Sequence, residues 1–273
     1  MNVKSLGYRT DLIFPAFDGE IIDRGDYLVI RSPANPAFYW GNFLLFSGPP
    51  GKGDFARWRE LFGREIGTPP QVEHQAFGWD TLEGETGFVE PFLSAGFGLN
   101  IDVVMTSETL RPPARPAPSV VVRALESDGD WQQTLDLQMV CREEGHEEGA
   151  YRIFRQRLMD RYRRMSDAGR GHWYGAFVDG QIVADLGIFH QDGSGRYQSV
   201  ETHPDFRRRG IAGTLIYKAG SQVIAEQSLH TLVMVAEADS GPARLYQSLG
   251  FVPREKSAGM LWFPRVEQPA TSS

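Results

Sequence analysis

The sequence predicts an α/β (α+β) chain of two domains, and three observations support this prediction. Runs in which apolar residues alternate, as in strands, are interspersed with runs in which they recur at helical spacing. Residues 111–118 hold four prolines in eight positions, which excludes a helix or a central strand and favours an extended linker. The length of 273 residues suits one large domain or two ordinary ones. We therefore expect domains over 1–110 and 119–266, a linker over 111–118 and a disordered tail over 267–273.

The first domain is predicted to begin with an extended segment of about fifteen residues and to continue with strands and one clear helix. We expect strands over 27–31, 38–46, 75–80 and 101–106, and a helix that starts at Asp54. A short helix end and Gly96-Phe97 precede the last of these strands. Leu249-Gly250-Phe251 precedes the final strand of the chain in the same way, which predicts an internal repeat of roughly 110 to 150 residues.

The second domain shows a regular series of elements. We expect strands over 119–124, 173–178, 182–190, 197–202, 231–236 and 259–263, and helices over 131–142, 151–165, 208–225 and 241–249. Asp179-Gly180 predicts a hairpin between two of these strands. One face of the 151–165 helix carries arginines, which we interpret as a solvated basic surface balanced by the acidic loop 143–149.

One turn in this domain combines groups that bind phosphate. Strand 197–202 leads into residues 207–210, Arg-Arg-Arg-Gly, and a helix follows at once. The first N–H groups of a helix have no partner inside it, and the helix dipole makes that end positive. Glycine lets a ligand approach the backbone, and arginine side chains form charge-assisted bonds to phosphate oxygens.

Residues 207–212, Arg-Arg-Arg-Gly-Ile-Ala, resemble the acyl-CoA loop of the GNAT acetyltransferases, which reads Gln or Arg, two residues, Gly, one residue, then Gly or Ala. Residues 239–251 are similar to the later helix of that family, which ends in Gly-Phe. The resemblance covers 119–263 and implies a GNAT fold there, with a mixed, mostly antiparallel sheet flanked by helices. The first domain has no counterpart of 207–212, so the repeat implies a degenerate GNAT-like half; an unrelated α+β domain is the alternative.

The resemblance implies transfer of an acetyl group from acetyl-CoA to a primary amine, by direct attack in a ternary complex. It also implies that the strand before the loop splays from its neighbour and exposes backbone groups to the thioester. The implied cofactor-binding residues are Val200, Thr202, Arg207, Arg208, Arg209, Gly210, Ile211, Ala212, Gly213, Thr214 and Asp239. Asp239 stands where the family usually has asparagine, and Pro242 where it has alanine.

Two residues are candidate catalytic groups. Tyr246 lies where the family frequently has a tyrosine that returns a proton to the CoA thiolate; the alternative is a core aromatic. Glu201 lies on the motif strand and is the best-placed base; the alternative is a solvent-facing carboxylate and a water chain. Asp185, Glu237 and His203 are lesser candidates.

Several questions stay open at this point. The acceptor could be a small-molecule amine or a peptide amine. The donor is expected to be acetyl-CoA, and the alternatives are another acyl-CoA or an aminoacyl donor. The other function considered is a non-catalytic, regulatory CoA-binding tandem module. The acceptor pocket is expected between the splayed strand, the 131–165 helices and the first domain. Five aromatic residues could line it, although core packing is the preferred interpretation: Phe38, Tyr39, Trp40, Trp79 and Trp173.

Composition limits the other function classes. The formal charge of −7 argues against nucleic acid or an anionic membrane as partner. The six histidines show no paired ligand spacing, so we expect no metal. The single cysteine, Cys141, fits a reducing cytoplasm, and we interpret it as a core side chain. The N-terminus has no signal-peptide core and no run reaches ~20 apolar residues, so we expect a cytoplasmic protein; homodimerisation is left open.

Overall fold

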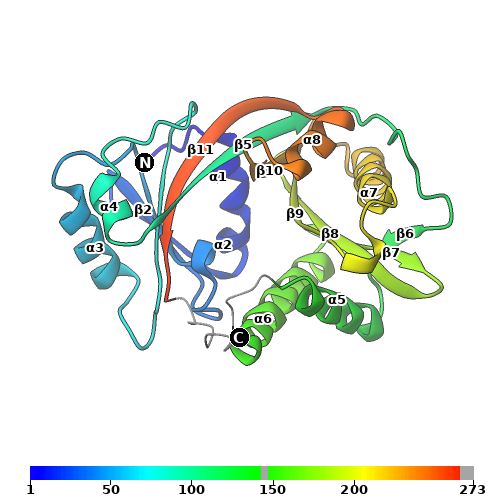
Figure 1. Cartoon of the computed structure of the whole chain (residues 1–273), viewed down its shortest axis with the longest axis horizontal. Coiled ribbons are helices and arrows are strands. Elements are labelled where there is room, and N and C mark those ends of the chain that lie inside the picture. The colour runs from blue at the N-terminus through cyan, green and yellow to red at the C-terminus, as the bar shows by residue number, and fades with distance from the viewer. Residues whose placement is uncertain (143–146, 265–273) are drawn as a thin grey trace, which may run out of the picture.

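The computed structural model describes residues 1–142 and 147–264. Within these residues the strands form one eleven-stranded sheet in the order β1-β2-β3-β4-β11-β5-β10-β9-β8-β7-β6 (Figure 1). Most neighbouring strands are antiparallel; β3–β4 and β9–β10 are parallel. Helices cover the sheet, which confirms the predicted mixed α/β fold. The predicted tail 267–273 and most of the acidic loop lie outside the described residues.

The front half contributes strands at one end of the sheet and the helices beside them. Its strands are β1 (Glu20–Asp23), β2 (Tyr27–Arg31), β3 (Phe43–Phe46), β4 (Gln75–Trp79) and β5 (Gly98–Ser107). Its helices are α1 (Leu6–Asp11), α2 (Ile13–Asp18), α3 (Asp54–Glu65) and α4 (Glu90–Ser94), with a 3₁₀ turn at Tyr39–Gly41. The strand expected over 38–46 is therefore shorter, because that turn occupies its first part.

The extended lead-in predicted for the first fifteen residues is wrong, because α1 and α2 occupy it. The Ser5 hydroxyl caps α1 by accepting from the Tyr8 N–H, and residues far away in the sequence bind the other N–H groups at this end. The Asp80 carboxylate accepts hydrogen bonds from the backbone N–H groups of Lys4 and Ser5, both at 2.8 Å. Glu255 accepts from the Ser5 hydroxyl (2.9 Å) and from the Leu6 N–H. These partners satisfy the N–H groups that the start of a helix leaves unpaired.

The back half follows the predicted series in order and type, but its last strand, expected over 259–263, begins at Val252. Its strands are β6 (Val121–Ala124), β7 (Gly171–Val178), β8 (Gln181–Gln191), β9 (Ser194–Thr202), β10 (Thr231–Glu237) and β11 (Val252–Trp262). Its helices are α5 (Asp128–Val140), α6 (Glu148–Asp167), α7 (Ile211–Gln227) and α8 (Gly241–Ser248), with a 3₁₀ turn at Pro204–Phe206. Helices α5 and α6 pack beside β7 and β8, and α7 packs against β7, β8 and β9.

The two halves exchange their last strands. β11, from the back half, pairs with β4 of the front half through Ala258↔Trp79 and its neighbours. β5, from the front half, pairs with β10 of the back half through Glu237↔Asp102 and its neighbours. The two exchanged strands also pair with each other, and Figure 1 shows them side by side between the halves. The sheet is thus continuous across the expected domain boundary, and the boundaries themselves stay a prediction.

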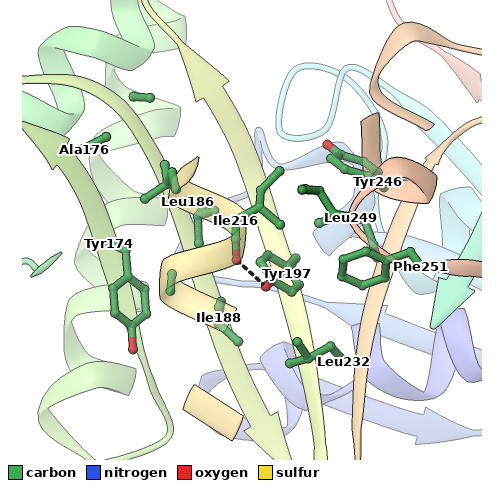
Figure 2. Close-up of a cluster of buried hydrophobic side chains, with 14 of the residues drawn as sticks. Tyr174, Ala176, Leu186, Ile188, Tyr197, Ile216, Leu232, Tyr246, Leu249 and Phe251 are labelled. Carbon is green, nitrogen blue, oxygen red and sulfur yellow. Dashed lines mark hydrogen bonds between the residues drawn. The ribbon is translucent and has the colours of Figure 1, made fainter. Parts of the chain in front are cut away.

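The predicted linker packs on the back half. The Arg111 N–H donates to the Leu249 carbonyl (2.8 Å), and the Ala117 N–H donates to the Thr214 hydroxyl (2.9 Å). The core beneath joins β7 to β10 with α7 and α8, and Figure 2 shows part of it. In this core the buried Tyr197 hydroxyl donates to the Ile216 carbonyl (3.0 Å), which fixes β9 to α7. These contacts hold the start of α7 and the end of β9 in place.

Candidate active site

The site begins where β9 and β10 separate. The two parallel strands pair only from Thr231↔Ser194 to Val233↔Arg196, although β9 continues to Thr202 and β10 to Glu237. Residues 197–202 therefore turn one backbone edge away from β10. This separation is the splay that the sequence resemblance implied, and it opens the sheet at the end of β9.

A bulge bends β9 inside this opening. Gly187 pairs with Gln198 and Asp185 with Glu201, so Ser199 and Val200 lie opposite a single residue of β8. Ser199 has φ 42°, in the left-handed region that side chains other than glycine rarely adopt. A bulge increases strand twist and re-aims the side chains beyond it. Here it directs the segment Val200–Thr202 toward the separated edge.

A cavity of about 760 Å³ follows this opening and reaches both halves. β9, α6 and α8 form most of its wall, and the loop 37–40 of the front half completes it. Six of the predicted site residues line it: Val200, Glu201, Thr202, Arg207, Ala212 and Tyr246. The remaining predicted residues lie outside its lining. The structure therefore brings both candidate catalytic residues into one space with the start of α7.

Helix α7 begins at this cavity with unpaired N–H groups. Gly210 is its N-cap, and no side chain caps the helix. Because Ala212 of the first turn lines the cavity, the positive end of the helix dipole borders it. Gly210 has φ 77°, and a Cβ there would collide with the Arg115 carbonyl oxygen of the linker. The sequence pattern explains this glycine by the close approach of a ligand to the backbone. The contact with the linker requires a glycine here as well.

The other loop residues divide between surface and core. The Arg207 Nε donates to the Thr202 carbonyl (3.1 Å) and so ties the loop to β9. Arg208 is exposed, and Arg209 lies over the Phe206 ring, 5.0 Å from its centre. Ile211, Gly213 and Thr214 are buried, and the Thr214 hydroxyl donates to the Gly210 carbonyl (2.9 Å). Asp239 is exposed, outside the cavity lining.

Tyr246 reaches the cavity from α8. The Ser240 hydroxyl caps this helix by accepting from the Ala243 N–H (3.2 Å), and Pro242 lies in the first turn, where its missing N–H costs nothing. The ring of Tyr246 packs against Phe251 at 6.3 Å between ring centres, and Figure 2 shows it at the edge of the core cluster. Burial raises the pKa of Tyr246 to about 12. The phenol therefore keeps its proton at neutral pH while its side chain lines the cavity.

Glu201 faces the cavity as half of an ion pair. The Arg155 guanidinium lies 2.7 Å from Glu201 Oε1, and both side chains are mostly buried. Asp185, the cross-strand neighbour of Glu201, is fully buried and accepts from Trp173 Nε1 and Gln138 Nε2, both at 3.2 Å. Burial first, and then the Glu201 charge, raise the pKa of Asp185 well above its usual range. Asp185, whose pKa is raised, therefore lies beside a Glu201 carboxylate that is paired with Arg155.

Sequence reasoning missed the role of Arg155. The predicted solvated arginine face of α6 is wrong for two residues, because the Arg155 and Arg161 side chains are only 13% and 4% exposed. Arg161 pairs with Asp18 of α2 (2.7 Å) and donates to Ser32, so it joins the two halves. The only signal for this was the position of both arginines close to the apolar stripe of the helix.

The expected aromatic residues separate into two groups. Phe38, Tyr39 and Trp40 are partly exposed and line the cavity. Trp79 and Trp173 are fully buried core residues, as preferred. Among the described residues, no group of three or more His, Cys, Asp or Glu side chains is placed to hold a metal ion. No helix in the described part of the chain is long and apolar enough to cross a membrane.

Comparison with known proteins places a family domain on these elements. Residues 169–253, from β7 to the start of β11, match the family model described as an acetyltransferase (GNAT) domain. No curated protein matches the chain.

Solved structures match over nearly the whole chain. A functionally unknown conserved protein from Staphylococcus epidermidis is similar at a TM-score of 0.73 and 14% identity, over 91% of this chain and 95% of that one. A GCN5-related N-acetyltransferase from Kribbella flavida is similar at a TM-score of 0.60 and 15% identity, over 92% of each chain. Another from Sphaerobacter thermophilus is similar at a TM-score of 0.56 and 16% identity, over 89% of this chain and 78% of that one. At these identities the likeness establishes the fold.

Proposed function

Because residues 169–253 form a GNAT acetyltransferase domain, we propose that this protein transfers an acetyl group from acetyl-CoA to a primary amine. One observation carries the proposal. The separated edge of β9, the uncapped start of α7 and Tyr246 of α8 all border the same cavity. These are, in order, donors for a thioester carbonyl, a place for a diphosphate and an acid for a leaving thiolate.

The start of α7 would hold the diphosphate. Its first N–H groups have no capping side chain, and the helix dipole favours an anion there. Arg207 lines the cavity close by and keeps guanidinium donors beyond the Nε that binds Thr202. Arg208 and Arg209 lie at the surface outside the lining, where they contribute positive potential rather than contacts inside the cavity.

The backbone beyond the bulge would hold the acyl group. Val200 and Thr202 lie on the part of β9 that no longer pairs with β10, and both line the cavity. An N–H group on this edge would donate to the thioester oxygen as negative charge develops on it during attack. Because the bulge fixes the direction of this edge, the donors are arranged before the substrate binds.

The chemistry needs three proton movements. The ammonium of the acceptor must lose a proton, after which its nitrogen lone pair attacks the thioester carbon and the C–S bond breaks. Tyr246 would then give its proton to the departing sulfur, because a phenol whose pKa is about 12 is protonated at neutral pH. The attacking nitrogen then sheds a second proton, which would restore the Tyr246 phenol, directly or through water, once that phenol has protonated the sulfur. Glu201, which lines the cavity, is the proposed base, and the proton that it takes would pass to solvent through water in the cavity.

Substitution of Ala212 tests the proposal without disturbing the fold. Ala212 lies in the first turn of α7 and lines the cavity. Ala212→Asp adds a negative charge that stabilises a helix start but repels a diphosphate. We expect calorimetry to show CoA affinity at least about tenfold weaker in Ala212→Asp and nearly unchanged in Ala212→Ser. Unchanged affinity in Ala212→Asp would remove the α7 turn from the site.

A release assay separates transfer from binding. The parent protein with acetyl-CoA and a panel of primary amines should release free CoA thiol faster than it does without amine. If CoA binds through the α7 turn but no amine accelerates thiol release, the protein is the non-catalytic CoA-binding module instead. If acetyl-CoA is inert and another acyl-CoA reacts, only the identity of the acyl group changes.

A further inference from the structure

Part of the cavity wall is aromatic and belongs to both halves of the chain. The front half supplies Phe38, Tyr39 and Trp40, and helix α6 supplies Tyr151 and Phe154. All five side chains are partly exposed, whereas the aromatic core residues Trp58, Trp79 and Trp173 are fully buried. We call these five residues the aromatic wall. Resting on the proposed function, we propose that the acceptor is a primary alkylamine that bears an aromatic ring, and that this wall binds the ring.

The aromatic wall is held rigidly across the junction of the halves. The rings of Phe38 and Phe154 are 5.8 Å apart at their centres, and Tyr151 lies edge-on to Phe154 at 5.7 Å. Asn35 Nδ2 donates to the Phe154 carbonyl (3.0 Å), and Asn42 Nδ2 donates to the Phe38 carbonyl (2.9 Å). Because these contacts order the rings in advance, a ligand would lose little binding energy in arranging them.

Core packing covers the aromatic wall only in part: Phe38 and Phe154 pack against one core cluster and Trp40 against another, yet each side chain stays partly exposed. A ring left partly exposed keeps apolar surface in contact with water, and a ligand that covers it removes that surface. Aromatic side chains gain further from ring partners, in offset or edge-to-face contact, than from alkyl groups of the same size. A concave, mostly apolar space with a few polar groups is also the usual form of a small-molecule site.

The charges at this end of the cavity favour an amine over an acid. Glu73, Glu147 and Glu201 all line the cavity, and the Glu147 carboxylate accepts from the Gly149 and Ala150 N–H groups at the start of α6. Arg155 is paired with Glu201, and Arg207 is at the α7 end, bound to Thr202. An aromatic amino acid would bring its carboxylate toward Glu73 and Glu147, whereas a simple arylalkylamine brings no anion. The arrangement therefore selects an amine without a neighbouring carboxylate.

A matched pair of amines tests the proposal. 2-Phenylethylamine and 2-cyclohexylethylamine have similar size and the same amine, but only the first has a π face. In the thiol-release assay we expect kcat/KM for the phenyl compound to exceed that for the cyclohexyl compound by about two- to tenfold. We also expect it to exceed that for spermidine, which has no ring. Equal values for the first pair, or preference for spermidine, would overturn the inference while leaving acetyl transfer intact.

Variants of the aromatic wall locate the effect. Phe154→Leu keeps an apolar side chain but removes the ring, and Phe88→Leu makes the same change at an exposed phenylalanine outside the cavity lining. We expect Phe154→Leu to raise KM for 2-phenylethylamine and reduce the phenyl preference, with CoA affinity unchanged; Phe88→Leu should change neither. Equal loss for both amines in Phe154→Leu would contradict ring recognition. If that variant does not fold, Phe38→Leu gives the same comparison. Absence of thiol release with every amine in the parent protein would instead count against the proposed function.

Discussion

Tyr246 is the residue whose side chain chemistry is most directly testable. It is buried, its pKa is raised to about 12 by burial, and it borders the cavity. We expect Tyr246→Phe to lower kcat by about 10²-fold or more with CoA affinity unchanged, because only the proton for the thiolate is lost. Tyr217→Phe, on α7 and outside the cavity lining, is the matched control. Steady-state kinetics and calorimetry measure both quantities, and full turnover in Tyr246→Phe would make the residue structural.

The same pKa sets a pH dependence. A phenol whose pKa is raised above its usual value near 10 stays protonated to higher pH. In the parent protein, ionisation of Tyr246 should therefore cause no loss of kcat/KM between pH 7 and about 10. Any fall of kcat/KM in that range would have to come from another group.

At the residue scale the sequence could propose site residues but not their surroundings. Tyr246, Glu201 and the α7 turn were proposed because motif spacing places residues along a chain, and the structure brings all three to one cavity. Arg155 was missed because several arginines lie on α6, and only packing decides which of them turn inward. Asp185 was a minor candidate because its burial beside Glu201 depends on the register of β8 against β9. Pairing register and helix rotation are set by tertiary contacts rather than by local sequence.

The element that shapes the site is the bulged strand β9. Ser199 adopts φ 42° there, which costs a side-chain-bearing residue about 1–2 kcal/mol. We expect Ser199→Val to lower the free energy of unfolding by about 1–2 kcal/mol, because a β-branched side chain tolerates this backbone least. Ser199→Gly should be nearly neutral or slightly stabilising. Urea denaturation compares the two, and equal stability of both variants would show that the bulge stores no strain.

Element boundaries were predictable where periodicity was strong. The strands and helices of the back half appear where their patterns placed them, and the Asp179-Gly180 hairpin joins β7 to β8. Helix α1 was missed although Ser5 caps it locally; Asp80 and Glu255, which also bind the N–H groups at its start, lie far away in the sequence. The bulge was equally hidden, because serine carries no preference for a positive φ. Local patterns predict elements that are stable through their own composition and miss those stabilised by remote partners.

The whole molecule depends on the exchange of β5 and β11. A fragment 1–110 would lack β11 between β4 and β5, and a fragment 119–273 would lack β5 between β10 and β11. We expect each fragment alone to aggregate or stay unfolded, because it exposes unpaired central strand edges. Co-expressed fragments should form a soluble one-to-one complex, measured by size-exclusion chromatography and circular dichroism. A soluble, folded 119–273 fragment would show that the exchange is dispensable.

The mixed α/β fold and the repeated helix end with Gly-Phe and a last strand were visible in the sequence. The exchange was not, because nothing local states which strand a distant strand will pair with. The linker shows the same limit. Its prolines predicted extended chain, but its contacts with Thr214 and Leu249, and its carbonyl against Gly210, come from the packing of α7 and α8.

The exchanged strands β5 and β11 also limit how substrates can enter the cavity. Two-lobed enzymes often admit ligands by swinging the lobes apart about a flexible joint. Here such a swing would have to break the ladder between β4 and β11 or that between β5 and β10. The sheet therefore holds the two halves at a fixed separation, and entry of substrates to the cavity depends on movement of side chains and loops. Acceptors are then selected by how well they fit a cavity of fixed width, and not by closure of the two halves around them.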